Sequence, residues 1–249
     1  MLLISIAVIS LLSGALVCFG CDAFSTLNWF WLLPVTALGF FVLLAALGFL
    51  FVLYLCKRVD QTQPQEDDSR FYRIVANLII ESAFPVLRIH VKKSGIVKIP
   101  SAGRFMLVCN HCNNSDPIIL LRCLPKFQLA FISKQENSTM FVIGPMMHKI
   151  LCQLINREND REALKTILRC IQIIKEDKAS IAVFPEGGIL SEDGKLHHFR
   201  PGVFKIAQKA NVPIVVCTLK NTKSHEVPGE FRLSRRESMP SRDDILQIR

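Results

Sequence analysis

The segment VCNHCNNSDP, residues 108–117, places a histidine five positions before an aspartate, directly after an apolar run. That run, RFMLVC at 104–109, has the length and composition of a buried strand. Asp116 followed by Pro117 is typical of a helix start, with the acid as N-cap and the proline at the first helical position. We therefore expect His111 just past the end of a strand, where open α/β sheets bind their ligands.

Two chemical interpretations of this segment stay open from its residues alone. Cys109 and Cys112 have the spacing of a thiol-redox pair or of half a metal site, but a structural zinc site needs four ligands and no second Cys or His pair with matching spacing occurs. His111 and Asp116 fit a general base and the carboxylate that orients it, since an imidazole held at one nitrogen can take a hydroxyl proton at the other. The plainer alternative is a polar loop histidine followed by an N-cap aspartate.

Strand and helix patterns alternate along the rest of the domain. Short apolar runs bounded by polar or turn residues predict strands, and longer amphipathic stretches predict helices. Such alternation indicates an α/β domain with a largely parallel sheet flanked by helices. We predict strands at 104–109, 127–132, 180–184 and 213–219, and helices at 117–124, from Asn159 onward and at 201–210.

Two of the predicted helices have apolar stripes. The helix from Asn159 begins with a capping-box pattern that ends at Glu162, and its stripe is expected to face the core. The helix that begins near Arg70 either packs on the core or lies partly in a membrane surface. The stripes are Leu164, Ile167, Leu168, Ile171 and Ile174 in the first and Phe71, Ile74, Val75, Leu78 and Ile79 in the second.

The apolar residues are concentrated at the N-terminus. The chain is 50% hydrophobic with a mean hydropathy of +0.33, and residues 1–21 and 29–56 contain no charged side chain. A bilayer core of ~30 Å is spanned by about 20 apolar residues in a helix, so residues 1–56 are predicted to form a transmembrane hairpin. A cleaved signal peptide is the alternative for the first stretch, but no basic residue precedes Lys57.

Charge sets the expected orientation and partners. Lys57 and Arg58 follow the second span, which predicts that the domain lies on the cytoplasmic side. All 30 Lys and Arg and all but one of the 21 Asp and Glu lie after residue 56, a net charge of +10. A basic, membrane-tethered domain attracts anionic lipids and acidic substrates. We expect no nucleic acid partner, because the chain has no zinc-finger spacing or aromatic-rich RNA motif.

The remaining boundaries follow from composition. Residues 57–69 are a polar linker, 70–220 the α/β domain, and 221–249 a polar tail that is expected to be disordered and without a clear strand. The sheet would then have an exposed edge. The nine cysteines are odd in number and irregularly spaced, which predicts reduced core residues rather than disulfides.

Further polar segments follow predicted strands. Phe184 to Gly188, FPEGG, follows one strand, and its two glycines permit close backbone approach to an anion. Together and in order, these segments resemble the motif blocks of the glycerolipid acyltransferase family, typified by lysophosphatidic acid acyltransferases, over about residues 70–220. The matching blocks are N-H-x-x-x-x-D with Asn110, His111 and Asp116; FISKQEN with Lys134 and Glu136; LINREN with Arg157; FPEG at 184–187; and V-P-I-V at 212–215.

The resemblance implies acyl transfer to lysophosphatidic acid, which gives phosphatidic acid. His111 would act as general base, oriented by Asp116, and the acyl thioester of CoA or acyl carrier protein would be attacked directly, without cofactor or metal. Three alternatives stay open: another acceptor (glycerol-3-phosphate or a different lysophospholipid), an inactive membrane-bound lipid-binding protein, and a thiol-redox protein. The residues implied to bind and shape the substrate site are Lys134, Arg157, Glu186, Gly187 and Arg200.

Two departures from the family pattern stand out. Family members often continue FPEG with Thr-Arg-Ser, whereas Gly188, Ile189 and Leu190 follow here, and Lys195 or Arg200 is the candidate to replace the missing arginine. Family domains also usually continue with further strands after the last block, where this chain has its polar tail.

Overall fold

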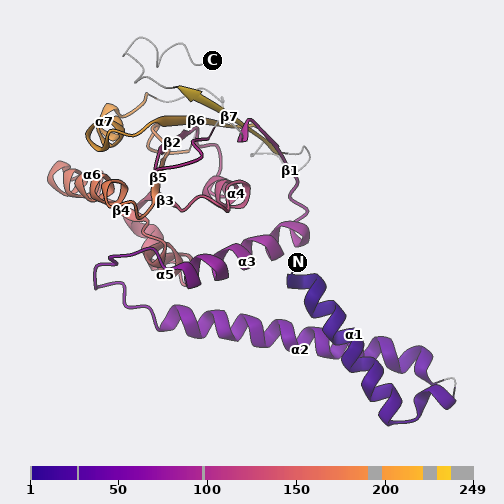
Figure 1. Ribbon diagram of the computed structural model, residues 1–249. Coiled ribbons are helices and arrows are strands. Elements are labelled where there is room, and N and C mark those ends of the chain that lie inside the picture. Colours follow the sequence, from indigo (N-terminus) through magenta and orange to yellow (C-terminus); the bar gives the residue numbers. More distant parts are fainter. Residues whose placement is uncertain (1, 27, 97–98, 190–197, 221–228, 237–249) are drawn as a thin grey trace.

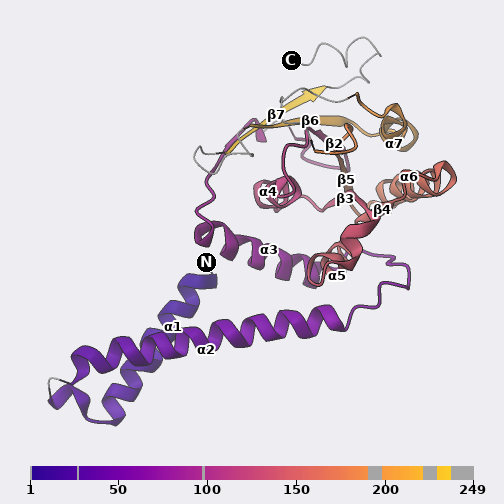
Figure 2. The same cartoon turned by 180° about the vertical axis from the view of Figure 1, so that it is seen from behind.

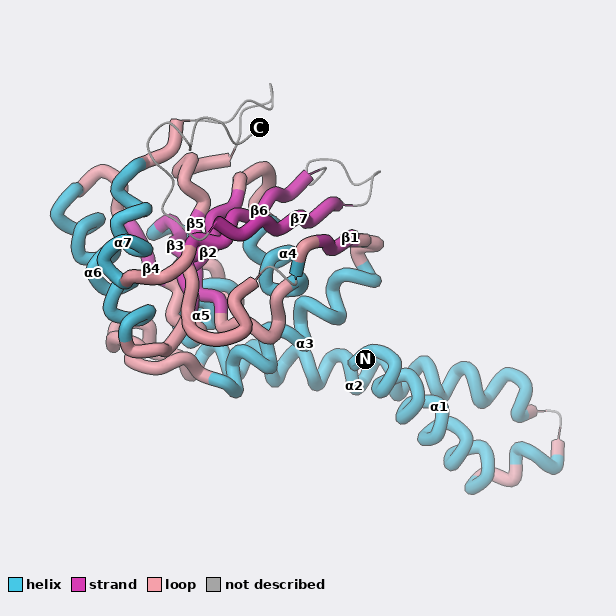
Figure 3. The backbone as a smooth tube through the Cα atoms, turned by 45° about the horizontal axis from the view of Figure 1, so that its top comes forward, coloured by secondary structure: helices cyan, strands magenta, loops and turns pink. Residues whose placement is uncertain are grey.

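The computed structural model describes residues 2–26, 28–96, 99–189, 198–220 and 229–236. The N-terminal part is a hairpin of two long helices, α1 (Leu2–Gly20) and α2 (Trp29–Lys57), joined through the short helix η1 (Ala23–Ser25). Both helices are long and apolar enough to cross a membrane, as predicted. Figures 1 and 3 show the turn of this hairpin projecting away from the α/β domain.

The α/β domain is built on a seven-stranded sheet in the order β1-β7-β6-β2-β5-β3-β4. Within the described part of the chain, every neighbouring pair is parallel except β6 and β7. The predicted, largely parallel α/β fold is thus confirmed. The strands are β1 (Val91–Ser94), β2 (Met106–Cys109), β3 (Leu129–Lys134), β4 (Gln153–Ile155), β5 (Ser180–Val183), β6 (Ile214–Lys220) and β7 (Gly229–Arg236).

Helices cover both faces of the sheet, and each face has its own apolar core. On one face α3 (Arg70–Val86) and α4 (Asp116–Cys123) pack over residues such as Leu107 and Phe131. On the other, α6 (Asp160–Lys175) and α7 (Lys205–Ala210) pack over residues such as Val108 and Ile181. The two views in Figures 1 and 2 place α6 and α7 side by side, apart from α3. The remaining described helices are α5 (Ile143–Lys149), η3 (Gln135–Thr139) and η4 (Pro201–Phe204).

The C-terminal prediction was wrong in one respect. Residues 229–236 form β7, which pairs antiparallel with β6 and parallel with β1, so the domain extends beyond residue 220 and the free edge of β6 is covered. A strand in this position depends on a partner edge that composition does not reveal. The rest of the predicted tail, 221–228 and 237–249, lies outside the described residues.

The start of α6 also differs in detail. The Asn159 side chain accepts hydrogen bonds from the backbone of Arg161 and Glu162, as a helix cap should. The Glu162 carboxylate, however, accepts from the Asn156 side chain at 2.8 Å, so the capping-box prediction holds only for its asparagine half. The reason is that Asn156, in the preceding loop, offers this carboxylate a competing donor.

The predicted apolar stripes are only partly buried. On α6, Ile167, Ile171 and Ile174 face the core, whereas Leu164 and Leu168 are each 56% exposed. The buried face of the helix also carries Cys170 and Ile173. The face that meets the core is therefore rotated about the helix axis relative to the predicted stripe. On α3, Phe71, Ile74 and Leu78 are exposed and Ile80 and Phe84 are buried.

The end of the linker is fixed to the domain. Asp68 and Arg73 form an ion pair at 2.5 Å with both side chains almost fully buried. The Arg73 guanidinium also donates to the carbonyls of Leu129, at 3.0 Å, and Ile150, at 3.3 Å. The Tyr72 hydroxyl donates to the Leu55 carbonyl at the end of α2. These contacts hold the second apolar helix and the domain in a defined relation.

Candidate active site

The candidate site lies at the carboxyl ends of four adjacent parallel strands. His111 follows β2, Glu186 follows β5, Lys134 ends β3 and Arg157 follows β4. Because these strands run in the same direction, their carboxyl ends meet at one edge of the sheet. A cavity of about 440 Å³ opens there, and its lining includes His111, Lys134, Arg157, Gly187 and Arg200.

Asp116 orients His111. The Asp116 side chain is fully buried, and its Oδ2 accepts from the His111 ring at Nδ1 (3.0 Å) and from the backbone N–H groups of Cys112 (2.6 Å) and Asn113 (2.8 Å). The predicted N-cap role is wrong: Ser115 is the cap residue and Asp116 is the first residue of α4. Three convergent donors turn the carboxylate back into the loop, where it holds the imidazole.

The histidine ring is held from two further sides. It stacks on Phe184, with ring centroids 4.2 Å apart and planes 22° apart, and its backbone N–H donates to Glu186 Oε2 at 3.3 Å. The Asn110 side chain pins the loop to β6 by bonding both the N–H (2.8 Å) and the carbonyl (2.9 Å) of Leu219. With Nδ1 engaged by Asp116, Nε2 is the nitrogen left for proton transfer.

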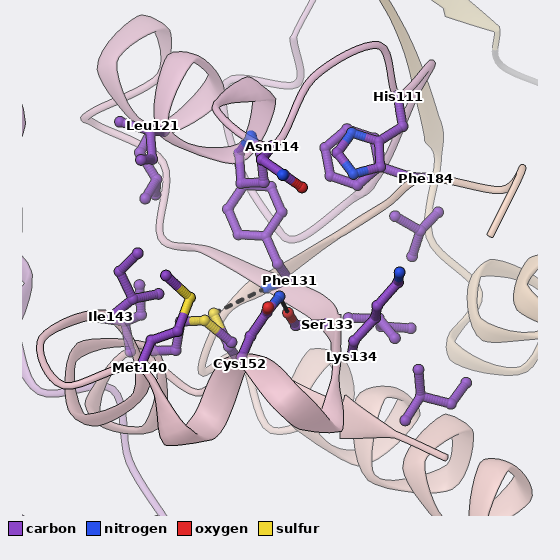
Figure 4. A pocket seen from close by; sticks show the side chains of 18 of the residues that line it. His111, Asn114, Leu121, Phe131, Ser133, Lys134, Met140, Ile143, Cys152 and Phe184 are labelled. Carbon is purple, nitrogen blue, oxygen red and sulfur yellow. Dashed lines mark hydrogen bonds between the residues drawn. The ribbon is translucent and has the colours of Figure 1, made fainter. Parts of the chain in front are cut away.

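Figure 4 shows how the cavity is divided. His111 and Phe184 lie together at one end, with Lys134 near the middle. The opposite end is apolar and is lined by side chains from α4, β3 and α5. Burial raises the pKa of the Cys152 thiol to about 11, so this side chain is a protonated part of the apolar wall. The labelled apolar residues at this end are Leu121, Met140, Ile143 and Cys152. Phe131 lies between the two ends and stacks on Phe184, with ring centroids 6.2 Å apart.

Arginines gather beside Gly187. Arg157 donates to the Gly187 carbonyl, and the Arg200 side chain lies over the Gly187 backbone. Burial first, and then the neighbouring Arg200 charge, lower the pKa of Arg157. Two guanidinium groups placed this close repel each other, and an anion bound between them would relieve that repulsion. Glu136 acts on Arg157 electrostatically and is not among the cavity-lining residues.

A side chain at Gly187 is expected to strain the backbone. Its φ of +75° lies in the left-handed region, and a Cβ there would sit 2.7 Å from Arg200 Nε. Gly187→Ala should therefore lower the free energy of unfolding by about 1–2 kcal/mol. Gly188→Ala is the matched control, because a Cβ at Gly188 meets nothing within 4 Å. Thermal unfolding in detergent measures both, and equal midpoints for the two variants would contradict the expectation.

The two cysteines of residues 108–117 have different surroundings. Cys109 points into the core beside Cys217 on β6, and burial raises the pKa of its thiol. Cys112 stays in the loop, where its Sγ lies 3.0 Å from Asn110 Nδ2. All nine cysteines are free and seven are buried, five of them in the two apolar cores of the α/β domain. Over the described ranges, no group of three or more His, Cys, Asp or Glu could hold a metal ion.

The structure brings the predicted site residues together. His111, Lys134, Arg157, Gly187 and Arg200 line one cavity, and Glu186 contacts the histidine loop. Lys195, the other candidate for the missing arginine, lies outside the described residues. Sequence reasoning assigned no role to two residues that hold the loop, Asn110 and Phe184, although both belong to the motif blocks that were recognised.

At the edge of this α/β sheet, His111 and Asp116 form the histidine–aspartate pair that the first motif block implied. The chain belongs to the Acyltransferase family, whose model matches residues 90–220. A probable 1-acyl-sn-glycerol-3-phosphate acyltransferase of Mycoplasma pneumoniae is 34% identical over 148 residues, covering 57% of this chain and 54% of that protein. A chloroplastic 1-acyl-sn-glycerol-3-phosphate acyltransferase of Brassica napus is 32% identical over 155 residues, covering 61% and 43%. The chain thus spans about half the length of the curated relatives it matches.

A solved structure supports the fold. The crystal structure of the 1-acyl-sn-glycerophosphate acyltransferase PlsC from Thermotoga maritima superposes with a TM-score of 0.59 at 20% identity, covering 78% of this chain and 80% of that one. At this identity the likeness concerns the arrangement of helices and strands.

Proposed function

We propose that the protein moves an acyl chain from acyl-CoA or an acyl carrier protein to the free hydroxyl of lysophosphatidic acid, giving phosphatidic acid. The observation that carries the proposal is the 3.0 Å contact between His111 Nδ1 and the buried Asp116 carboxylate, at the polar end of a largely apolar cavity. Family membership and the names of the relatives support the same reaction.

The reaction needs one proton shuttle. His111 Nε2 takes the proton from the acceptor hydroxyl, and the oxygen attacks the carbonyl carbon of the acyl thioester. The tetrahedral intermediate collapses with loss of the thiolate, which recovers the proton from the imidazolium and leaves as a free thiol. Asp116 holds the ring in one orientation and stabilises the imidazolium while it exists.

The cations beside Gly187 suit the acceptor phosphate. Arg157 and Arg200 present guanidinium groups that can donate in pairs to phosphate oxygens. Lys134 adds a third positive charge at the end of β3. The apolar end of the cavity would receive an acyl chain. Its side chains from α3, such as Ile79 and Ile80, lie on the helix whose outer face exposes Phe71 and Ile74.

Arg200→Gln is expected to raise KM for lysophosphatidic acid about tenfold and to change KM for the acyl donor little. The reason is the loss of one charge-assisted hydrogen bond to the phosphate, discounted for the exposure of Arg200. Lys209→Gln is the control, because Lys209 is also an exposed cation and does not line the cavity. Unchanged acceptor KM in Arg200→Gln would remove this residue from the phosphate site.

The activity itself is tested with an acceptor panel. Membranes containing the protein are supplied with labelled acyl-CoA, or with acyl carrier protein loaded with the same chain, and with lysophosphatidic acid, glycerol-3-phosphate or another lysophospholipid. Labelled phosphatidic acid should form fastest from lysophosphatidic acid. Faster acylation of a different acceptor would replace the proposed substrate, and labelling of none of them would leave a lipid-binding protein without activity.

We also propose that α1 and α2 span the membrane and that the catalytic domain lies on its cytoplasmic side. Cys21, in the turn of the hairpin, and Cys112, beside the site, are the two cysteines that are not buried. In intact cells, a membrane-impermeant thiol reagent should label a variant that retains only Cys21 and miss one that retains only Cys112. Labelling of Cys112 from outside would reverse the orientation.

A further inference from the structure

The loop between β2 and α4 uses most of its backbone N–H groups for its own structure. Those of Cys112 and Asn113 donate to Asp116 Oδ2 at 2.6 and 2.8 Å. The Asp116 N–H donates to the Asn113 carbonyl at 3.0 Å, and the Ser115 N–H donates to the Asn113 side-chain oxygen at 3.1 Å. The His111 N–H donates to a carboxylate oxygen in the loop after β5. None of these groups is left for a substrate.

Asn114 is the exception in this loop. Within the described part of the chain, neither its backbone N–H nor its carboxamide makes a hydrogen bond. The residue is exposed and lines the same cavity as His111. Figure 4 shows its side chain pointing into the cavity on the side of His111 and Phe184. The loop that carries the base therefore also presents an amide donor to the cavity.

The other neutral amide and hydroxyl side chains that the structure describes in the cavity lining have a partner. Asn137 donates to the Ser133 hydroxyl at 2.8 Å, so these two residues are engaged with each other. Ser133 also belongs to β3, whereas Asn114 and His111 share one short loop. The arginines beside Gly187 face the proposed phosphate site. Asn114 is thus the neutral donor on the side of the base.

Acyl transfer creates a negative charge near that base. The acceptor hydroxyl gives its proton to His111 Nε2 while its oxygen bonds to the thioester carbonyl carbon, and an electron pair moves onto the carbonyl oxygen. The reacting carbonyl has to lie close to Nε2, because the oxygen that attacks it gives up its proton there. A donor at the same end of the cavity can therefore reach the oxyanion.

We propose that Asn114 is a catalytic residue whose carboxamide N–H donates to the thioester carbonyl oxygen and stabilises the oxyanion of the tetrahedral intermediate. The inference rests on the proposed acyl transfer and adds a residue to it. The hydrogen bond strengthens as charge develops on the oxygen, so its contribution falls on kcat rather than on KM. When the intermediate collapses, the electron pair re-forms the carbonyl, the C–S bond breaks and the thiolate takes the proton from the imidazolium.

The test measures kcat and KM of the full-length protein in detergent, with lysophosphatidic acid and acyl-CoA. Asn114→Ala removes the donor and should lower kcat about 10²-fold, with little change in KM for either substrate. Asn114→Asp keeps the shape but places a carboxylate beside the oxyanion, so it should be slower than the alanine variant. Asn77→Ala is the matched control and should keep the wild-type kcat, because Asn77 lies on α3 and does not line the cavity.

Two kinetic outcomes would overturn the proposal. Unchanged kcat in Asn114→Ala would mean that the amide does not meet the oxyanion, and a raised KM with unchanged kcat would mean that it binds a substrate instead. Thermal unfolding is measured in parallel, and a lower midpoint in both Asn114 variants would assign the loss of rate to the fold of the loop.

Failure of the proposed function is recognised separately. If wild type formed no labelled phosphatidic acid, the same variants would be compared in hydrolysis of acyl-CoA, where water replaces the acceptor and the same oxyanion forms. A lower hydrolysis rate in Asn114→Ala would then support the donor role without the proposed acceptor. Equal hydrolysis by wild type and variant, or no turnover of any kind in wild type, would overturn it.

Discussion

Replacing His111 with alanine is expected to lower kcat for acyl transfer about 10²- to 10⁴-fold. The ring sits in the polar end of the cavity with Nδ1 bound to Asp116 and Nε2 free for the acceptor proton. No other described histidine lines that cavity, so no second imidazole can take over. KM for both substrates should change much less, because alanine removes the base and leaves the arginines in place.

The control for this variant comes from the same loop. Cys112→Ser keeps the size of the side chain and the backbone N–H that donates to Asp116, and it should retain kcat within a few-fold. The measurement is labelled phosphatidic acid formed per minute from lysophosphatidic acid at saturating donor. If Cys112→Ser abolished turnover and His111→Ala did not, thiol chemistry would replace general-base catalysis.

Asp116→Asn is expected to lower kcat by about 10²-fold or more. In the wild type a single oxygen, Oδ2, accepts from the His111 ring and from the backbone of Cys112 and Asn113. In the asparagine variant the side-chain oxygen can still accept from these donors, but it lacks the negative charge that stabilises the imidazolium. In the other orientation its NH₂ faces two backbone N–H groups and a ring N–H, which forces the loop or the tautomer to change.

Asp160→Asn separates this effect from a general loss of negative charge near the cavity. Asp160 also lines the cavity, but it is exposed in the first turn of α6, and its amide variant should stay within about twofold of wild type. The two variants are compared in kcat and in thermal unfolding. Equal kcat in Asp116→Asn and Asp160→Asn would show that Asp116 does not orient a catalytic base.

Several elements followed from local sequence because their signals are local. The helix cap at Asn159, the strand that ends at Cys109 and the apolar helices of residues 1–56 depend on side chains within a few positions of one another. The same holds for His111 and Asp116, since a loop of five residues is short enough to let the carboxylate reach the ring.

Other elements had no such signal. The strands β1 and β4 are short and partly exposed, so neither shows an apolar run or a clear alternation. The strand β7 exists through its pairing with β6 and β1. Leu164 and Leu168 have the spacing of a core stripe, and only the packing of α6 against its neighbours turned them outward.

The sequence by itself determined that this chain joins two long apolar segments to an α/β domain and that His111 has a carboxylate within reach. Only the tertiary structure decided which cations share a cavity with that histidine. Lys134, Arg157 and Arg200 follow His111 by 23 to 89 residues. Lys134 ends β3 and Arg157 follows β4, in a sheet ordered β2-β5-β3-β4 in space rather than in chain order. Arg200 precedes η4 and is tied to the loop after β5, because its backbone N–H donates to the Pro185 carbonyl at 2.9 Å. Side chains so far apart in sequence meet because parallel strands bring their carboxyl ends to one edge, and strand order is set by packing across the whole sheet.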